Sequence, residues 1–295
     1  MGQSISTQTK RAVGQIVSYP QRIICLTEET TETLYLLGQQ DRIVGISGYT
    51  VRPPEARKGK PKVSAFINAK FDKIMSLEPD LVLAFSDLQA GIAAELIKRG
   101  VNVMTFNQRS ITEIFQMILC LARIVGCEDK GLELVDHLRK DLEAISQSAQ
   151  RFPKRYKVLF EEWYDPIISG IRWVEELIEI AGGLNLFPEL RNCQAAKDRI
   201  VSHEEIIKRN PEVIIASWCG RQVKKQKICE REGWSRISAI RDNHIYEVKS
   251  TYILQPGPAS LTEGVRQIHA ILAHVHGVEI NKSIAPLEST DKDIR

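Results

Sequence analysis

The chain has 295 residues, of which 43% are hydrophobic and 26% charged, and its formal net charge is +3. This composition is typical of a folded globular protein and excludes a disordered or fibrous chain, and the small, dispersed positive excess argues against a nucleic-acid partner. No run of about 18 apolar residues occurs, so we expect no insertion into a membrane.

The cysteines and the first residues bear on location. The six cysteines form no CxxC pair and have no zinc-ligand spacing, which favours reduced thiols over a disulfide framework. The first twenty residues are polar and lack the apolar core of a secretory signal. We therefore expect a cytoplasmic protein as the sequence is written, and a periplasmic or cell-surface protein if a native leader has been removed.

The first part of the chain alternates short apolar runs with amphipathic segments. After an N-terminal extension at 1–21, residues 22–109 are predicted to form an α/β lobe. Strands are expected at 22–26, 43–47, 81–85 and 102–106, and helices at 28–37, 68–77 and 89–99. Continuous apolar strands between helices indicate a parallel sheet covered on both faces.

The second part begins with one long amphipathic stretch. Residues 110–152 are predicted to be a connecting helix with a break or kink near Gly126 and Gly131. A second α/β lobe follows at 153–277, and a charged tail at 278–295 is expected to be disordered. Its strands are expected at 157–163, 213–218 and 244–248, and its helices at 173–181, 202–209, 221–230 and 259–276.

An internal echo supports this division. IMSLEPDLVLA at 74–84 and IIKRNPEVIIA at 206–216 share an apolar pair, a polar turn, a Pro-acid step and a buried strand. Two similar lobes explain the echo better than one sheet does, although a chance likeness of two corners is the alternative. The expected fold class is α/β, with two Rossmann-like lobes of mostly parallel strands, a long interlobe helix and a ligand cleft between the lobes.

Large aromatic residues gather in the loops after the predicted strands of both lobes, except that Trp173 begins the following helix and Trp218 ends its strand. They are Tyr49, Phe66, Trp163, Tyr164, Trp173 and Trp218. Ligands of open α/β sheets bind beyond the carboxyl ends of the strands, so we predict that these rings line a ligand site. Polar residues beside them are candidates for orienting the ligand or for neutralising a phosphate or propionate on it: Thr50, Arg52, Asp165, Ser169 and Gln255. For any single ring, a place in the core is the alternative.

The width of this aromatic set favours a bulky ligand. A buried ring of about 150 Å² contributes roughly 4 kcal/mol, whereas association costs on the order of 4 to 15 kcal/mol. Two or three rings are therefore needed for tight binding of a neutral ligand. A flat macrocycle would use all of them, and a sugar or an amino acid would not.

Four segments resemble class III periplasmic substrate-binding proteins of the cobalamin and iron-siderophore type, and most of all the cobalamin-binding members. These segments are RIICLTEETTETLYLLG, SGY-x-x-RPP, SAFINAKFDKIMSLEPDLVLA and SHEEIIKRNPEVIIAS, and the likeness runs from Arg22 to His276. The resemblance implies a non-catalytic binding component of an ABC importer with little hinge motion and no cofactor of its own. The implied ligand is cobalamin or a related corrinoid, or another bulky compound such as haem or a ferric siderophore.

The resemblance also assigns roles to single residues. Tyr49 and Phe66 match two aromatics of the first lobe, although the family has Trp at the position of Phe66, and Trp163 falls near the aromatic that faces them. Asp72 and Glu204 match the two carboxylates that dock onto arginines of the permease. For these two acids, stabilisation of the helix N-terminus is the alternative. Trp173 and Trp218 have no assigned counterpart.

Two other readings remain open. A metal-ion-binding member of the family needs ligands from both lobes, but all six histidines lie at His137 or later, so we expect no metal site. A cytoplasmic enzyme on the same fold would use Cys219 as nucleophile with His203 or His244 as base. No GxSxG, P-loop or HExxH motif supports catalysis, so we expect no enzyme.

Overall fold

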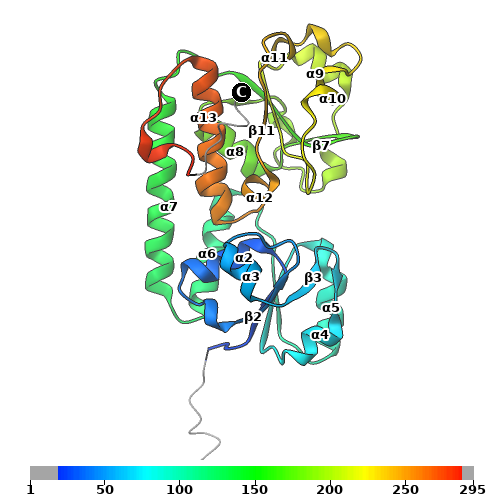
Figure 1. Ribbon diagram of the computed structural model, residues 1–295, viewed down its shortest axis with the longest axis vertical. Coiled ribbons are helices and arrows are strands. Elements are labelled where there is room, and N and C mark those ends of the chain that lie inside the picture. Colours follow the sequence, from blue (N-terminus) through cyan, green and yellow to red (C-terminus); the bar gives the residue numbers. More distant parts are fainter. Residues whose placement is uncertain (1–18, 288–295) are drawn as a thin grey trace, which may run out of the picture.

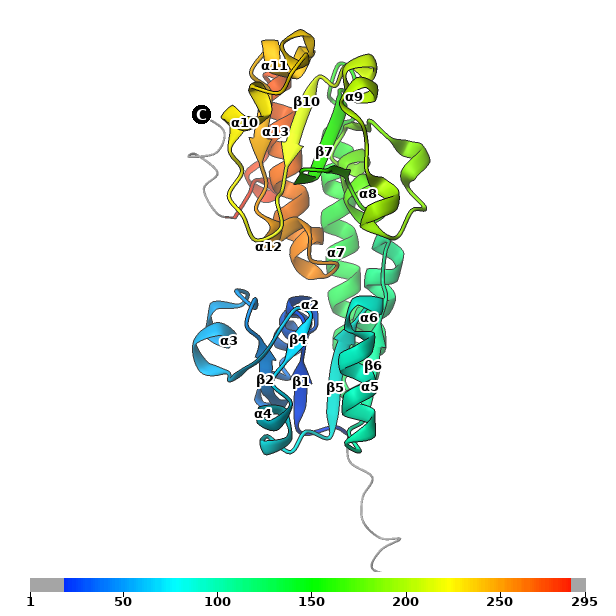
Figure 2. The same ribbon diagram turned by 90° about the vertical axis from the view of Figure 1, so that its right-hand side faces the viewer.

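The computed structural model describes residues 19–287, which form two α/β lobes stacked along the long axis of the molecule (Figures 1 and 2). The predicted N-terminal extension lies almost wholly outside the described residues. Along residues 19–287, no helix is both long and apolar enough to cross a membrane.

The N-terminal lobe is built on a six-stranded sheet in the order β4-β3-β2-β1-β5-β6. The strands are β1 (Ile23–Cys25), β2 (Ile43–Ser47), β3 (Lys62–Ala65), β4 (Asn68–Ala69), β5 (Leu81–Phe85) and β6 (Val103–Phe106). All neighbours are parallel except β3 and β4. Its helices are α2 (Glu28–Leu36), α3 (Pro54–Gly59), α4 (Phe71–Ser76) and α5 (Ala90–Lys98). The central strands are buried on both faces, which confirms the predicted parallel sheet.

The C-terminal lobe repeats this plan with a sheet in the order β11-β10-β7-β8, and β9 also pairs with β7. The strands are β7 (Lys157–Tyr164), β8 (Ile167–Ser169), β9 (Leu184–Asn185), β10 (Val213–Ala216) and β11 (Ile245–Glu247). Its helices are α8 (Arg172–Ile180), α9 (His203–Arg209), α10 (Lys225–Cys229), α11 (Ser238–Arg241), α12 (Ser250–Ile253) and α13 (Val265–His276).

The internal echo corresponds to the same corner in both lobes. In each copy a short helix is followed, one or two residues later, by a residue with positive φ, Glu78 at 45° or Asn210 at 52°, and then by a proline and a buried strand. The two strands, β5 and β10, each pair with parallel neighbours on both sides. The sequence echo therefore reflects one structural unit that occurs in both lobes.

The connection between the lobes is a helical hairpin, which corrects the prediction of one connecting helix over 110–152 and places the expected break at Gly126. Helix α6 (Ile111–Ile124) ends before Gly126, whose φ is +73°, and α7 (Glu128–Ala149) then runs back along it (Figure 1). A Cβ at Gly131 would lie 2.5 Å from the Cβ of Ala122, so glycine permits the close crossing of the two helices. Helix α7 has 22 residues and is about 33 Å long.

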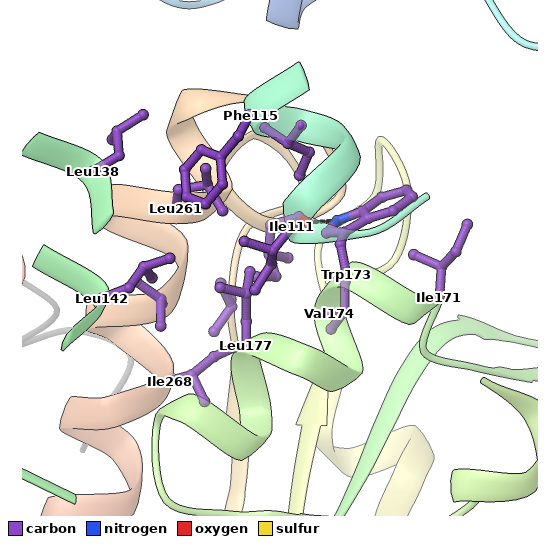
Figure 3. Close-up of a cluster of buried hydrophobic side chains, with 14 of the residues drawn as sticks. Ile111, Phe115, Leu138, Leu142, Ile171, Trp173, Val174, Leu177, Leu261 and Ile268 are labelled. Carbon is purple, nitrogen blue, oxygen red and sulfur yellow. Dashed lines mark hydrogen bonds between the residues drawn. The ribbon is translucent and has the colours of Figure 1, made fainter. Parts of the chain in front are cut away.

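One buried apolar cluster extends through both lobes and the hairpin. Figure 3 shows side chains of α6, such as Ile111 and Phe115, packed against Val174 and Leu177 of α8 and Ile268 of α13. The backbone N–H of Ile111 also donates to a carboxylate oxygen of Glu176 at 2.8 Å. Because the lobes share this core, relative motion between them would expose apolar surface.

The predicted disordered tail is packed where the structure describes it. Ile284 is buried in the main apolar cluster, and the N–H of Leu287 donates to a carboxylate oxygen of Glu263 at 2.8 Å. This corrects the prediction for residues 278–287, because an apolar side chain in the charged segment anchors it. Residues 288–295 lie outside the described residues.

Candidate ligand-binding site

The carboxyl edge of the N-terminal sheet carries three aromatic rings. Tyr49 follows β2 and is 59% exposed, Phe66 follows β3 and is half-buried, and Phe85 ends β5. The N–H of Tyr49 donates to the Ser47 hydroxyl at 3.2 Å, which fixes the turn beneath the ring. The parallel course of β2, β3 and β5 therefore brings the rings of Tyr49, Phe66 and Phe85 to the same end of the lobe.

The carboxyl edge of the C-terminal sheet carries a second group of rings at the end of β7. Trp163 and Tyr164 are half-buried, with ring centroids 5.1 Å apart. Asp165 is exposed, and its carbonyl accepts the indole N–H of Trp163 at 3.1 Å. Arg221 lies over the Trp163 ring at 5.3 Å, and Lys227 lies over the Tyr164 ring at 5.6 Å. This group offers partly exposed aromatic faces beside cations.

Two of the predicted ligand-contacting rings belong to the interior instead. Trp173 is 4% exposed, its indole N–H donates to the carbonyl of Ile253 at 2.9 Å, and it packs in the apolar cluster of Figure 3. Trp218 is 3% exposed and donates to Glu161 at 2.8 Å. The prediction that Trp173 and Trp218 line the ligand site is therefore corrected, because neither ring offers a free face.

The polar residues predicted to orient a ligand lie at these same edges. Thr50 is fully buried, and its hydroxyl has no hydrogen-bond partner among the described residues. Arg52 donates to Glu32 at 3.0 Å, and its guanidinium lies 5.3 Å from the ring centroid of Tyr252 in the other lobe. Gln255 is half-buried in the segment between α12 and α13. Arg52 is therefore engaged in contacts between the lobes.

The carboxyl edges of the two sheets face each other, and we call them the meeting edges. The segments beside these edges are in direct contact. The N–H of Ala259 donates to Glu32 at 3.1 Å, and the Gln108 amide donates to the carbonyl of Pro256 at 2.9 Å. A Cβ at Gly257 would lie 2.4 Å from the Cβ of Glu29, so only glycine fits there. Helix α2 and the loop after β6 thus contact the segment between α12 and α13.

Three buried glutamates stand at the first two turns of α2, beside this contact. Burial, followed by the charges of Glu29 and Glu32, raises the pKa of Glu28 to about 8. Burial also raises the pKa of Glu29 to about 7, and it raises the pKa of Glu32 against the opposing charge of Arg52. The sequence interpretation missed this cluster. The three glutamates follow the predicted strand at 22–26, and a position after a strand was the criterion by which the aromatic rings were selected.

The sequence interpretation also missed two arginines at the same level of the molecule. Arg109 follows β6 and lies over the ring of Phe85 at 4.9 Å. Arg199, 2% exposed, donates to Glu162 at 2.6 Å. Arg109 also follows a predicted strand, whereas nothing in the pattern around Arg199 marked it.

Two hollows lie on the surface of the N-terminal lobe and the helical hairpin. One of about 410 Å³ lies between α5 and β6 and is lined by residues such as Asp87, Ala94 and Asn107. The other, of about 640 Å³, is lined by Tyr19 and the turn between α6 and α7. Neither of these two hollows is lined by residues of the C-terminal lobe.

The structure gives the metal and enzyme readings no support in the described part of the chain. No group of three or more potential ligand residues is arranged to hold a metal ion within 19–287. The ring of His203 accepts the indole N–H of Trp234 at 2.9 Å. Burial, followed by the charges of Glu162 and Glu28, raises the pKa of the Cys219 thiol, which disfavours a thiolate nucleophile.

The two carboxylates predicted to dock onto a permease occupy equivalent places. Asp72 lies in the first turn of α4 and Glu204 in the first turn of α9, at the helices that precede β5 and β10. Both are exposed; Asp72 lies 3.6 Å from Arg99, and the backbone and Ser202 lower the pKa of Glu204. Asp72 and Glu204 thus have equivalent positions and are both exposed, but the residues beside them differ.

The sequence and structure of the chain are similar to those of known binding proteins. The family model of periplasmic binding proteins matches residues 23–252. An ABC transporter substrate-binding lipoprotein of Bacillus subtilis, YvrC, is 30% identical over 259 residues, which cover 84% of this chain and 79% of that protein. A vitamin B12-binding protein of Vibrio parahaemolyticus is 28% identical over 243 residues, covering 82% of this chain and 86% of that protein.

A solved structure extends the likeness to the whole architecture. It is that of a possible iron-binding, periplasmic solute-binding protein of Staphylococcus epidermidis, with a TM-score of 0.72 and 26% identity, covering 88% of this chain and 98% of the other. The match spans both lobes and the connection between them. The chain therefore belongs to the periplasmic binding protein family of non-catalytic substrate-binding proteins of ABC transporters.

Proposed function

We propose that the protein binds a bulky, flat ligand between its lobes and delivers it to an ABC permease. Cobalamin or a related corrinoid is the first candidate, and haem and ferric siderophores are the alternatives. The carrying observation is that partly exposed rings stand on both meeting edges, Tyr49 and Phe66 on one and Trp163 and Tyr164 on the other.

The energetics favour a ligand that reaches both edges. Association costs on the order of 4 to 15 kcal/mol, and one buried ring contributes roughly 4 kcal/mol. A ligand held by one edge would bind weakly. A ligand that covers rings of both lobes gains enough apolar contact, and the exposed Asp165 and the half-buried Gln255 would orient it.

Relatives support the choice of ligand class. The Vibrio parahaemolyticus relative is named for vitamin B12, and the Staphylococcus epidermidis structure is named as possibly iron-binding. Corrinoids, haem and ferric siderophores are all large metal chelates. We therefore test the three together.

Tryptophan fluorescence tests the proposal. Titrating the protein with cyanocobalamin, haemin and ferrichrome should give saturable quenching with at least one, with a Kd below about 10 μM, as expected for two or more ring contacts. Trp163 is the half-buried reporter, so a Trp163→Phe variant should bind the same ligand with reduced quenching. Absence of saturable quenching with all three ligands at tens of micromolar would contradict the proposal.

We further propose that Asp72 and Glu204 dock the protein onto arginines of its permease, which places it in the periplasm or at the cell surface. Reversing both charges, Asp72→Lys with Glu204→Lys, should reduce ligand uptake by cells at least tenfold while ligand affinity stays unchanged. Glu133→Lys, an exposed change on α7, is the matched control. Normal uptake with the doubly reversed variant would contradict the docking role.

A further inference from the structure

The aromatic pair at the end of β7 is in contact with other side chains of its own lobe. The ring centroids of Trp163 and Tyr164 lie 5.1 Å apart, and the Tyr164 ring lies 4.8 Å from that of Trp218. Arg221 lies over the Trp163 ring at 5.3 Å, and Lys227 lies over the Tyr164 ring at 5.6 Å. Arg221 also donates to the Tyr164 hydroxyl at 3.2 Å. A ligand that reaches this pair therefore meets two cations of the chain before it covers the rings.

The aromatic side of this contact is held firmly. Trp218 is 3% exposed, and its indole N–H donates to a carboxylate oxygen of Glu161 at 2.8 Å. Glu161 is fully buried and also accepts two hydrogen bonds from Arg231, at 2.6 and 2.9 Å. Arg231 in turn donates to the carbonyl of Tyr164 at 3.2 Å. Breaking a buried ion pair leaves an uncompensated charge, so Trp218 and the backbone of Tyr164 are expected to stay in place.

The backbone of the segment that carries the two cations is anchored as well. Val223 and Ile228 are buried in an apolar cluster of the C-terminal lobe, and the N–H of Val223 donates to a carboxylate oxygen of Glu247 at 3.1 Å. The side chains of Arg221 and Lys227, by contrast, are exposed. Exposed side chains exchange rotamers within nanoseconds, so both cations can leave the rings without movement of a loop or a lobe.

We infer that Arg221 and Lys227 are internal competitors of the ligand, which cover the aromatic pair in the unliganded protein and lower the affinity of the site. This inference rests on the proposed function and deepens it. A cation over an exposed ring favours the covered state roughly two- to fivefold, so two cations together favour it about five- to thirtyfold. Every ligand that covers the pair is weakened by this factor, and the cations cover the rings again after the ligand has left.

Removing the two charges tests this competition. The probes are cyanocobalamin, haemin dimethyl ester and ferrichrome, because none of them carries a net negative charge that the cations would attract. The probe that binds the wild type should bind Arg221→Gln with Lys227→Gln about five- to thirtyfold more tightly in calorimetric titration. A role of the two cations in holding the ligand predicts the opposite sign. Unchanged or weaker binding by this double variant would overturn the inference.

A matched control separates the competition from a general effect of charge. Lys208→Gln with Lys224→Gln removes two positive charges at exposed positions of the same lobe. This control variant should bind the same probe as the wild type does, within about twofold. A gain in affinity as large as that of the double variant would mean that net charge, and not the uncovering of the rings, strengthens binding, and it would overturn the inference.

Quenching of tryptophan fluorescence by acrylamide tests the covering of the rings without any ligand. Of the four tryptophans, Trp173, Trp218 and Trp234 are 4% exposed or less, so a neutral quencher reports mainly on Trp163. The double variant should show a larger Stern–Volmer constant than the wild type, and the control variant should match the wild type. Equal quenching of the double variant and the wild type would overturn the inference.

The two measurements distinguish failure of the inference from failure of the proposed function. If none of the three probes binds either the wild type or the double variant, the proposed function fails. Stronger acrylamide quenching of the double variant would then still support the covering of Trp163 by the chain's own cations. If a probe binds the wild type but the double variant shows neither tighter binding nor stronger quenching, the proposed function stands and the competition is refuted.

Discussion

Replacing Phe66 and Trp163 together with alanine is expected to weaken ligand binding at least about 100-fold. Each ring is half-buried at a meeting edge, one in each lobe, so each is positioned to lose solvent contact when the ligand binds. Truncating a well-packed contact ring commonly costs about 2 kcal/mol or more, and two such losses combine. Isothermal titration calorimetry with the ligand identified by fluorescence measures the effect.

Stability measurements separate a binding role from a core role. The double variant should melt within a few degrees of the wild type, because neither ring is enclosed in the interior. Trp173→Ala is the matched control, since that ring is buried and its removal should cost about 3 to 5 kcal/mol. A double variant as unstable as Trp173→Ala would mean that Phe66 and Trp163 are core residues.

The second large effect is a loss of stability as the pH rises. Burial raises the pKa of Glu28 to about 8 and that of Glu29 to about 7 from an ordinary value of 4.5. Their contribution to folding is therefore fully present below the unfolded pKa and is lost as the pH rises through the folded values. Between pH 6.5 and 9 we expect a loss on the order of 2 kcal/mol, or several degrees in Tm.

A variant with neutral amides isolates this effect. Glu28→Gln with Glu29→Gln should flatten the pH dependence above pH 6.5, leaving the smaller slope due to Glu175, whose pKa burial raises to about 7. Burial lowers the pKa of His269 and His276, so these residues act mainly below this range. Glu133→Gln on exposed α7 is the control. An unchanged slope in the double variant would show that the buried pair does not hold its protons.

Most of the fold could be predicted from the sequence, because the features that specify its strands and turns lie close together along the chain. Continuous apolar runs predicted the central strands, and the Pro-acid echo predicted the repeated corner that Glu78 and Asn210 complete with positive φ. A break or kink near Gly126 and Gly131 was predicted, but the reversal of the chain into a hairpin was not, because both helices are amphipathic and their apolar patterns join smoothly. Only the left-handed conformation of Gly126 separates them, and a glycine alone does not reveal its φ.

The candidate site was only partly accessible. Tyr49, Phe66, Trp163 and Tyr164 lie at strand ends as predicted, and their ligand contact remains a prediction. Trp173 shares a helix face with the buried Leu177, a helical spacing that would have placed it in the core. Trp218 is buried through its bond to Glu161 on a neighbouring strand, and such long-range pairing has no local signal.

The charged groups of the site were the least accessible part. Glu32 and Arg52 lie 20 residues apart, and Arg199 lies 37 residues from Glu162, so their pairing depends on the tertiary fold. Glutamate and arginine are usually exposed, so their residue types alone gave no reason to place them at a ligand site. Only burial and proximity make them candidates for function.

A crystal structure of the protein with the ligand that quenches its fluorescence tests the central claim most directly. We predict electron density for that ligand between the lobes, with Tyr49 or Phe66 against one face and Trp163 or Tyr164 against the other. Density elsewhere, for instance in the hollow between α5 and β6, or contact with rings of a single lobe only, would contradict the account.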